Sequence, residues 1–214
     1  MKVCIMVPHP DDEVLGFGGI IQKHIEKGNN VSVVFAEASD CQRSHTQQNH
    51  TKEVASFLGY SPFWLKINAS NLTNPSQKTI TIIEEFLANL LPDILYLPSL
   101  LDTHQSHSGL FNNARIATRM YGKAPIKQIF CGEIPSSTDC SITQISRPFS
   151  PTHFEILTQE QIEKKVDALS IYAEEVRTFP HPRSKEGIIT YAKKRGMECN
   201  NLYAEAFECL RYIE

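Results

Sequence analysis

Short apolar runs alternate with longer amphipathic segments along this chain, and this alternation constrains the fold more than any other feature. The first apolar run, residues 2–7, is too short for a helix and ends at Pro8, as expected of a buried strand. An amphipathic segment over 14–27 and a second apolar run over 31–36 follow it. A strand, a helix and a strand in this order predict a right-handed crossover between two parallel strands.

The same pattern continues to the end of the sequence. We expect helices at 51–58, 78–91, 108–121, 159–176 and 185–195, strands at 63–67, 93–97 and 126–131, loops at 39–48 and 133–152, and an element of undecided type at 203–212. This order predicts an α/β fold, a Rossmann-like and mostly parallel sheet with helices on both faces. The length favours a single domain over residues 1–214. In such sheets the ligand crevice lies outside the carboxyl ends of the strands.

Composition excludes several classes of function. Lys and Arg total 21 against 24 Asp and Glu, a net charge of −3, so a polybasic nucleic-acid-binding protein is not expected. No apolar run is long enough to predict membrane insertion. The six cysteines are scattered without a CxxC pair, and no signal peptide precedes the first strand, which predicts a reducing cytoplasm.

The first polar cluster follows directly on the first strand. It places His9 beside three carboxylates, Asp11, Asp12 and Glu13, and it is bracketed by Pro8 and Pro10. Adjacent carboxylates repel one another unless a cation compensates them. The alternative is that these residues are a solvated acidic N-terminus of the helix that follows.

The second cluster, residues 102–107, comes a few residues after the predicted strand 93–97, so the two clusters share one edge of the sheet. His104 and His107 are three residues apart at the start of a predicted helix and can face one crevice. Two histidines and a carboxylate leave positions open on a metal, as in catalytic zinc and non-haem Fe(II) sites. A closed structural zinc site is disfavoured because no cysteine pair accompanies either cluster.

These two motifs together resemble the PIG-L/LmbE-like family of metal-dependent N-acetylglucosaminyl deacetylases, whose motifs are (A/P)HPDDE and HxDH. Further segments of the chain are similar to family segments: Glu53 with Leu58 and Gly59, and residues 132–137, 181–184, 195–196 and 203–207. The resemblance implies an enzyme that hydrolyses the acetamide of an N-acetylated amino sugar or its conjugate and releases acetate and a free amine.

The resemblance also implies roles for particular residues. His9, Asp12 and His107 would be the ligands of a zinc ion, with Fe²⁺ or another divalent metal as alternatives. Asp11 would be the general base. His104 would stabilise the oxyanion or protonate the leaving amine. Asp11 and Asp12 are adjacent, so we expect their side chains to point in different directions.

Two departures from the family pattern matter. Ser106 stands where the family commonly has Asp, and a hydroxyl cannot supply the negative charge that would orient a neighbouring imidazole. A catalytically weakened metal- or sugar-binding relative is therefore an alternative. In addition, residues 173–175 read Ala-Glu-Glu where relatives often have Ser-Gln, which alters the expected rim of the pocket.

A second enzyme class also fits part of the pattern. His9, Asp11 and His107 satisfy the HxD…H arrangement of Fe(II) oxygenases, which usually have a β jelly roll, so the fold discriminates the two hypotheses. The residues that we name as candidates for substrate binding are Arg43, Arg119, His181 and Arg183. The expected partner is a small amino-sugar molecule, and the sequence leaves the formation of a homo-oligomer open.

Overall fold

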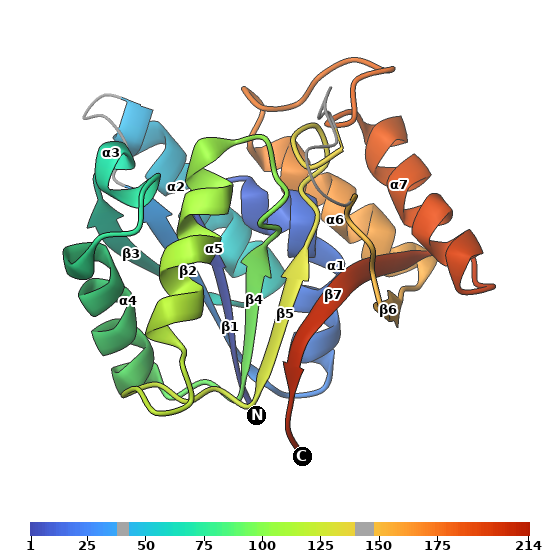
Figure 1. The fold of residues 1–214 in the computed structure, drawn as a ribbon. Coiled ribbons are helices and arrows are strands. Elements are labelled where there is room, and N and C mark those ends of the chain that lie inside the picture. The colour runs from blue at the N-terminus through green and yellow to red at the C-terminus, as the bar shows by residue number, and fades with distance from the viewer. Residues whose placement is uncertain (38–42, 140–147) are drawn as a thin grey trace.

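A computed structural model describes residues 1–37, 43–139 and 148–214, with side chains from residue 46 onward in the second range (Figure 1). Within these residues a seven-stranded sheet has the order β3-β2-β1-β4-β5-β7-β6. The strands are β1 (Lys2–Val7), β2 (Asn30–Glu37), β3 (Ser61–Ile67), β4 (Ile94–Pro98), β5 (Gln128–Gly132), β6 (His153–Ile156) and β7 (Ala204–Tyr212). The helices are α1 (Asp12–Glu26), α2 (Arg43–Leu58), α3 (Ala69–Leu72), α4 (Gln77–Leu90), α5 (Gln105–Ala117), α6 (Gln159–Ile171) and α7 (Lys185–Glu198).

The sheet is parallel over five of its strands, which confirms the predicted α/β fold. β1 pairs in parallel with β2 on one side and β4 on the other, with Val3 opposite both Val31 and Ile94. β3 and β5 extend the parallel part. β7 inserts antiparallel between β5 and β6, so one edge of the sheet is mixed.

Successive side chains of β1 enter two different cores, as the two-residue period of a strand requires. Val3, Ile5 and Val7 pack with α1, α2 and α6 on one face. Cys4 and Met6 pack with α4 and α5 on the other. A central strand covered on both faces must be apolar throughout, which is why residues 2–7 show no polar alternation. Figure 1 shows α4 and α5 in front of the sheet and α1 behind it.

Several boundaries differ from the sequence expectation. Of the loop expected at 39–48, residues 39–42 lie outside the described part of the chain, and residues 43–48 are the first turns of α2. α5 begins three residues before the expected helix, because His104 caps it. α6 ends at Ile171, five residues early. The undecided segment at the end is a strand, β7, and its partner β6 was not predicted.

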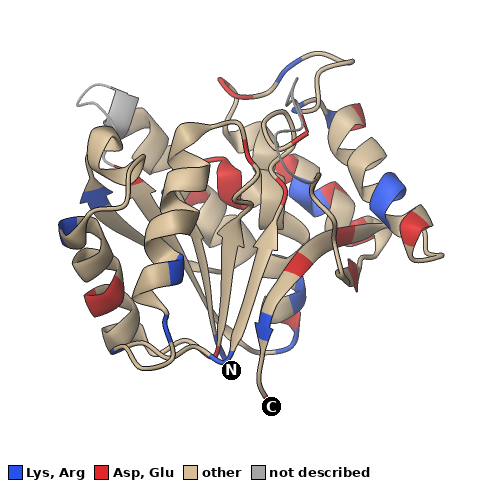
Figure 2. Ribbon diagram, viewed as in Figure 1, with Lys and Arg blue, Asp and Glu red and all other residues tan. Residues whose placement is uncertain are grey.

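The position of α5 depends on one glycine. A Cβ atom at Gly109 would lie 2.4 Å from the carbonyl oxygen of Leu72, so only glycine allows α5 to pack this closely on α3. This contact fixes the start of α5 beside the carboxyl ends of the strands. Figure 2 shows acidic positions just beyond the upper ends of β4 and β5, on the edge where the sequence places both polar clusters. Among the described residues no helix is both long and apolar enough to cross a bilayer.

Candidate metal centre and active site

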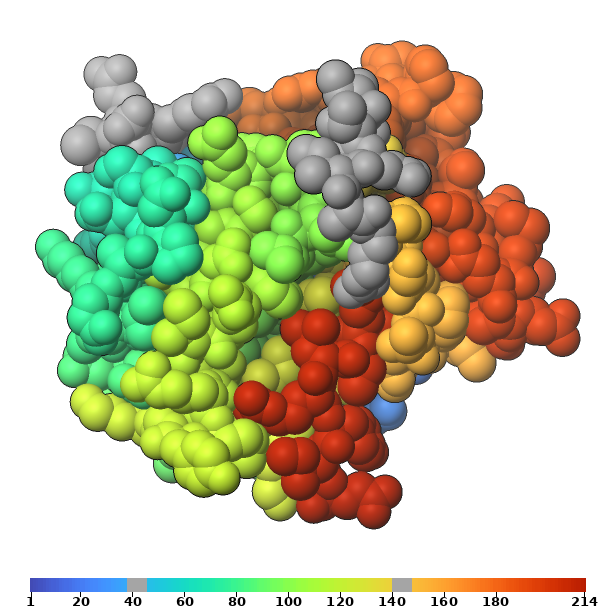
Figure 3. All heavy atoms as spheres, viewed as in Figure 1, coloured from blue at the N-terminus to red at the C-terminus, as the bar shows by residue number. Residues whose placement is uncertain are grey.

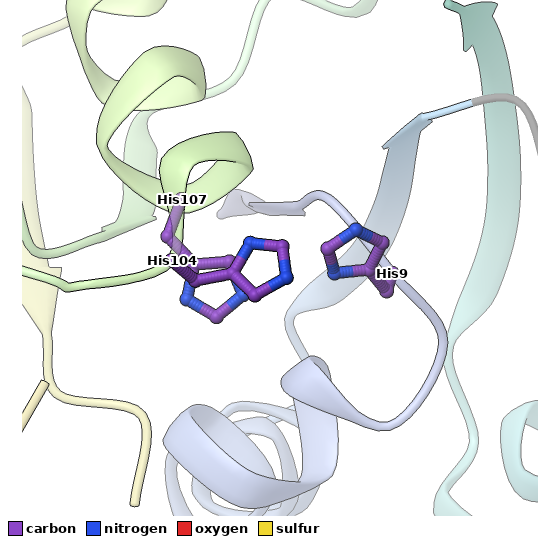
Figure 4. Close-up of side chains that lie close together, drawn as sticks. All are labelled: His9, His104 and His107. Carbon is purple, nitrogen blue, oxygen red and sulfur yellow. The ribbon is translucent and has the colours of Figure 1, made fainter. Parts of the chain in front are cut away.

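Three histidines from the two sequence clusters meet at the carboxyl edge of the sheet. His9 follows β1, His104 is the N-cap of α5, and His107 lies in its first turn. One ring nitrogen from each lies within 4.8 Å of the others. Figure 4 shows the rings of His104 and His107 stacked on one side and the ring of His9 facing them. The predicted convergence of the two clusters is therefore present in the structure.

The carboxylate of Asp12 lies between two of these rings. Its Oδ2 atom is 3.1 Å from Nδ1 of His9 and 3.1 Å from Nε2 of His107. The Asp12 side chain is 2% exposed. Burial opposes the charged form, but the two imidazoles outweigh burial and hold the pKa of Asp12 well below its usual value. Asp12 is thus an ionised carboxylate in the interior, and its Oδ2 atom also accepts a hydrogen bond from the backbone N–H of His9 at 3.1 Å.

The far nitrogens of the same two rings also face carboxylates. Nε2 of His9 lies 3.1 Å from Oε2 of Glu37, and Nδ1 of His107 lies 3.0 Å from Oδ2 of Asp102. The second contact is an ion-pair distance without good hydrogen-bond alignment. Metal-binding histidines usually carry an outer carboxylate of this kind, which sets the tautomer and orients the ring.

Both imidazoles are held in their protonated form by these acids. Burial lowers the pKa of His9, but hydrogen bonds to Asp12 and Glu37 raise it to about 10. Burial likewise lowers the pKa of His107, and the charge of Asp12 with the contact to Asp102 raises it to about 9. A divalent cation can take the place of these protons, because metal binding requires neutral imidazoles and releases protons. The donor set fits a catalytic metal such as zinc.

Two candidate trios of metal ligands share His9 and His107. The sequence motif selects Asp12 as the third ligand, whereas the ring nitrogens alone select His104. His104 is the most exposed of the three histidines, and its Nδ1 accepts a hydrogen bond from the backbone N–H of Ser106 at 3.3 Å. Partial burial and then the neighbouring His107 and His9 lower the pKa of His104. We favour Asp12, because it is buried, ionised and in contact with both shared histidines.

Asp11 points away from Asp12, as expected for adjacent residues at this turn. Its backbone has a φ of 97°, which is strained for a residue with a side chain. Its Oδ2 atom is 2.9 Å from a terminal nitrogen of Arg183, and its side chain is 6% exposed. Burial and then the charge of Asp12 raise the pKa of Asp11 well above its usual value, although Arg183 opposes this shift.

Glu13, the third carboxylate of the motif, lies below the site and does not line the cleft described below. It accepts hydrogen bonds from the hydroxyls of Tyr60 (3.1 Å) and Tyr172 (2.7 Å) and from the backbone N–H of Asp11 (2.9 Å). Burial raises the pKa of Glu13 to about 7. Its contact with the backbone of Asp11 supports the strained turn.

The four candidate substrate-binding residues have different positions. Arg183 contacts Asp11 and Glu175, and its Nε donates to Ser136 at 2.8 Å. His181 accepts from the backbone N–H of Arg183 and supports this loop.

Of the other two candidates, only Arg119 has a described side chain, and it lies away from the site. Arg119 follows the far end of α5, about 20 Å along the helix from the histidines, and contacts Glu84 at 3.8 Å. The side chain of Arg43 lies outside the described residues.

A cleft of about 710 Å³ opens over the histidines. It is lined by Pro8, His9, Pro10, Asp11, Asp12, Glu37, Gln47, Asn68, Ala69, Ser70, His104, His107, Glu175 and Arg183. Figure 3 shows the α6–α7 loop, which carries the last two of these residues, at the same upper edge of the molecule as the start of α5. This volume is in the range of small-molecule sites, and most of its lining is polar.

Sequence reasoning gave no role to three acids of the site. Glu37 ends β2, and its position at the carboxyl end of a central strand is the signal that identifies it. Asp102 lies in the second motif but was not assigned, and it accepts hydrogen bonds from the hydroxyls of Ser137 and Thr138. Glu175 was noted as a departure at the rim, and the structure places it 3.1 Å from Arg183.

The family model of the GlcNAc-PI de-N-acetylases, PIG-L, matches residues 4–118, more than half of the chain and both motifs. The chain belongs to the PIG-L family. It is therefore a hydrolytic enzyme of the deacetylase type, as the motifs predicted. None of the curated proteins matches the chain in sequence.

Solved structures share the fold over nearly the whole chain. N,N′-diacetylchitobiose deacetylase from Pyrococcus horikoshii has a TM-score of 0.73 at 19% identity, covering 98% of this chain and 83% of that one. The zinc-inhibited form of teicoplanin deacetylase has a TM-score of 0.71 at 13% identity, covering 98% and 97%. The 4-carboxy-2-hydroxymuconate hydratase from Pseudomonas putida has a TM-score of 0.75 at 17% identity, covering 100% and 98%.

The hydratase shows that this fold supports more than one reaction, so the reaction must be argued from the residues of the site. The α/β fold also argues against the Fe(II) oxygenase hypothesis, because those oxygenases usually have a β jelly roll.

Proposed function

We propose that this PIG-L protein is a zinc-dependent N-deacetylase, one domain over residues 1–214, acting on the acetamide of an N-acetylated amino sugar or its conjugate. The observation that carries the proposal is the Asp12 carboxylate in contact with His9 and His107, beside a second buried acid that faces the same cleft. Zinc is proposed because two imidazoles and one carboxylate form its usual catalytic ligand set.

In this proposal His9, Asp12 and His107 hold the metal. When bound, zinc supplies a Lewis acid that polarises the acetamide carbonyl and lowers the pKa of a water to about 7. Asp12 neutralises one charge of the cation. Glu37 and Asp102 hold the two imidazoles from behind.

Asp11 is the proposed general base. Its carboxylate accepts a proton from the attacking water as the C–O bond forms, and its raised pKa makes it a stronger base than an ordinary aspartate. The contact with Arg183 orients the carboxylate. The proton that Asp11 gains is then delivered to the amine nitrogen as the C–N bond breaks, which yields acetate and a free amine.

His104 is proposed to donate a hydrogen bond to the oxygen of the tetrahedral intermediate. Its Nδ1 atom accepts from the backbone of Ser106, so the neutral ring carries its proton on Nε2. The lowered pKa keeps this ring neutral at neutral pH, which favours the hydrogen-bonding role over the role of acid for the leaving amine.

The substrate class follows from the cleft. Its volume of about 710 Å³ accommodates a sugar, and Gln47, Asn68 and Ser70 offer uncharged hydrogen-bonding groups to hydroxyls. P. horikoshii diacetylchitobiose deacetylase and teicoplanin deacetylase share this fold and are deacetylases of different compounds. Because the family model is that of GlcNAc-PI de-N-acetylases, we propose a GlcNAc-type group as the part of the substrate that is deacetylated. The cytoplasmic location and a homo-oligomeric state stay predictions.

The experiment uses the purified full chain, stripped of metal by a chelator and reloaded with one equivalent of zinc. Acetate release is measured with N-acetylglucosamine, diacetylchitobiose and a panel of N-acetylhexosamine conjugates. We expect release from at least one substrate, its loss after chelation, and its loss in Asp11→Asn with zinc still bound. Absence of acetate from every compound, or full activity of Asp11→Asn, contradicts the proposal.

A further inference from the structure

Glu37 joins the ends of three elements at the edge of the metal centre. It is the last residue of β2, and its side chain is 17% exposed. Its Oε2 atom accepts a hydrogen bond from the hydroxyl of Ser106 in α5 at 2.6 Å. The same oxygen lies 3.1 Å from Nε2 of His9, which follows β1. One carboxylate oxygen thus connects the two halves of the proposed metal site.

Ser106, which donates to Glu37, occupies a position where the family differs from this chain. The family pattern commonly has Asp there, and a serine hydroxyl carries no charge. In this chain the hydroxyl of Ser106 donates to a carboxylate that comes from another strand. The carboxylate of Glu37 therefore supplies a negative group that is hydrogen-bonded to Ser106, the position where the family commonly has an Asp.

We propose that Glu37 is a positioning residue that replaces the charge missing at residue 106 and sets the orientation of His9. The inference rests on the proposed function for its effect on turnover, but not for its effect on metal affinity. In the neutral ring that metal binding requires, Nε2–H of His9 donating to Glu37 would leave the lone pair of Nδ1 on the side where Oδ2 of Asp12 lies. Without the carboxylate the ring loses the partner that selects this tautomer.

With Glu37 in this role, the expected effect of Ser106→Asp on activity changes sign. A catalytically weakened relative would gain activity when Ser106→Asp restores the family residue. With Glu37 in place, the same substitution brings two carboxylates to hydrogen-bond distance in a half-buried position, where they repel. The gain is expected only when Glu37 is removed at the same time.

The test is a double-mutant cycle on the full chain, with the zinc dissociation constant measured by competition with a chelating dye. For Glu37→Gln, which keeps the shape and removes the charge, we expect affinity to fall by about 10–100-fold, the range for outer partners of metal ligands. Ser106→Asp alone also weakens binding. The double variant Glu37→Ser with Ser106→Asp returns affinity to within a few-fold of wild type, and its kcat recovers in parallel.

Glu155 provides a matched control. It pairs with His153 at 2.8 Å, its side chain is also 17% exposed, and it lies on β6, outside the lining of the cleft. Glu155→Gln should leave the zinc dissociation constant unchanged. Should Glu37→Gln lower the yield of folded protein, Ser106→Ala removes the second hydrogen bond to the carboxylate, and a smaller loss of affinity is expected.

The outcomes separate this inference from the proposed function. Zinc affinity of Glu37→Gln equal to that of Glu155→Gln overturns the inference, and so does a double variant no better than either single one. A wild-type protein that binds no zinc overturns it as well. If zinc affinity follows the cycle while no acetate is released, Glu37 retains its role and the proposed deacetylation fails.

Discussion

Asp11 and Arg183 form an ion pair across 172 positions of the chain, with 2.9 Å between Oδ2 and a terminal guanidinium nitrogen. The pair connects the turn after the first strand to the loop before α7. It places the proposed base under two opposing influences, since burial raises its pKa and the guanidinium lowers it. Its net effect is a buried acid with a fixed orientation and a raised affinity for a proton.

Replacement of the base separates turnover from metal binding. We expect Asp11→Asn to reduce kcat by roughly 10²–10⁴-fold, the usual contribution of a general base. Zinc affinity stays near wild type, because the metal contacts assigned here come from Asp12 and the histidines. Steady-state acetate release and dye competition on the same preparation measure both quantities. Equal losses in both would show that Asp11 acts on the metal instead.

Replacement of Arg183 moves the pH profile in a defined direction. The guanidinium lowers the pKa of Asp11, so in Arg183→Gln that pKa rises and the base is deprotonated only at higher pH. The ascending limb of kcat/KM against pH should therefore shift to higher pH. Arg119→Gln is the matched control, because Arg119 is remote and half-exposed, and its profile should superimpose on wild type. A downward shift for Arg183→Gln contradicts the assignment.

Glu175 modulates the same arginine. It lies 3.1 Å from Arg183 and offsets part of its charge at the rim of the cleft. Glu175→Gln removes this negative charge, so we expect KM to fall several-fold for substrates with a carboxylate or phosphate beside the acetamide. KM for a neutral substrate such as diacetylchitobiose changes little. A uniform change for both substrate types argues against an electrostatic role.

The zinc affinity of histidine variants distinguishes the two candidate ligand trios. His107→Ala should weaken zinc binding by more than the roughly 10–100-fold loss expected for an outer partner. His104→Ala should leave affinity within a few-fold of wild type and lower kcat, because its role is to bind the oxyanion. Zinc titration of both variants compares them directly. A larger loss of affinity in His104→Ala would select the all-histidine trio.

His24 makes stability depend on pH. Burial lowers its pKa from 6.5 to about 4, while its ring contacts the hydroxyl of Tyr96 and the amide of Asn29. The unfolded chain therefore binds a proton between these pH values and the folded chain does not, so stability falls as the pH drops from 6.5 to 4, by roughly 3 kcal/mol. In His24→Gln this component disappears. Urea unfolding of both proteins at pH 8 and pH 5 isolates the difference, and equal losses would contradict it.

The sequence predicted the fold well where burial on two faces imposes a uniform pattern. The central strand β1 is apolar and buried from Val3 to Val7 because both faces are covered, and its pattern was unambiguous. The first turns of α2 were missed because residues 43–48 are all polar in sequence, so no hydrophobic periodicity marks them as helix. β6 is four residues long and half-buried, so it left no distinct apolar run.

The site was predictable as far as it is encoded in short motifs. His9, Asp12 and His107 lie in two such motifs, and the structure brings their side chains together, while their role as ligands stays a prediction. Glu37 and Glu175 belong to no motif, and their contacts depend on the register of β2 and on the course of the loop after α6. The structure places Arg119 after the far end of α5. Its sequence position could not indicate this, because one polar residue near a helix end carries no information about which end of the sheet it meets.

The ion pair between Asp11 and Arg183 connects two parts of the enzyme that can vary independently, the motif after β1 and the α6–α7 loop. The proposed metal ligands all come from the first half of the chain, whereas Glu175 and Arg183 come from one loop in the last fifth. Substitutions in that loop can change which compounds are accepted without altering the ligands of the metal. Diversification within this architecture, natural or by loop grafting, is therefore expected to concentrate at residues 173–184.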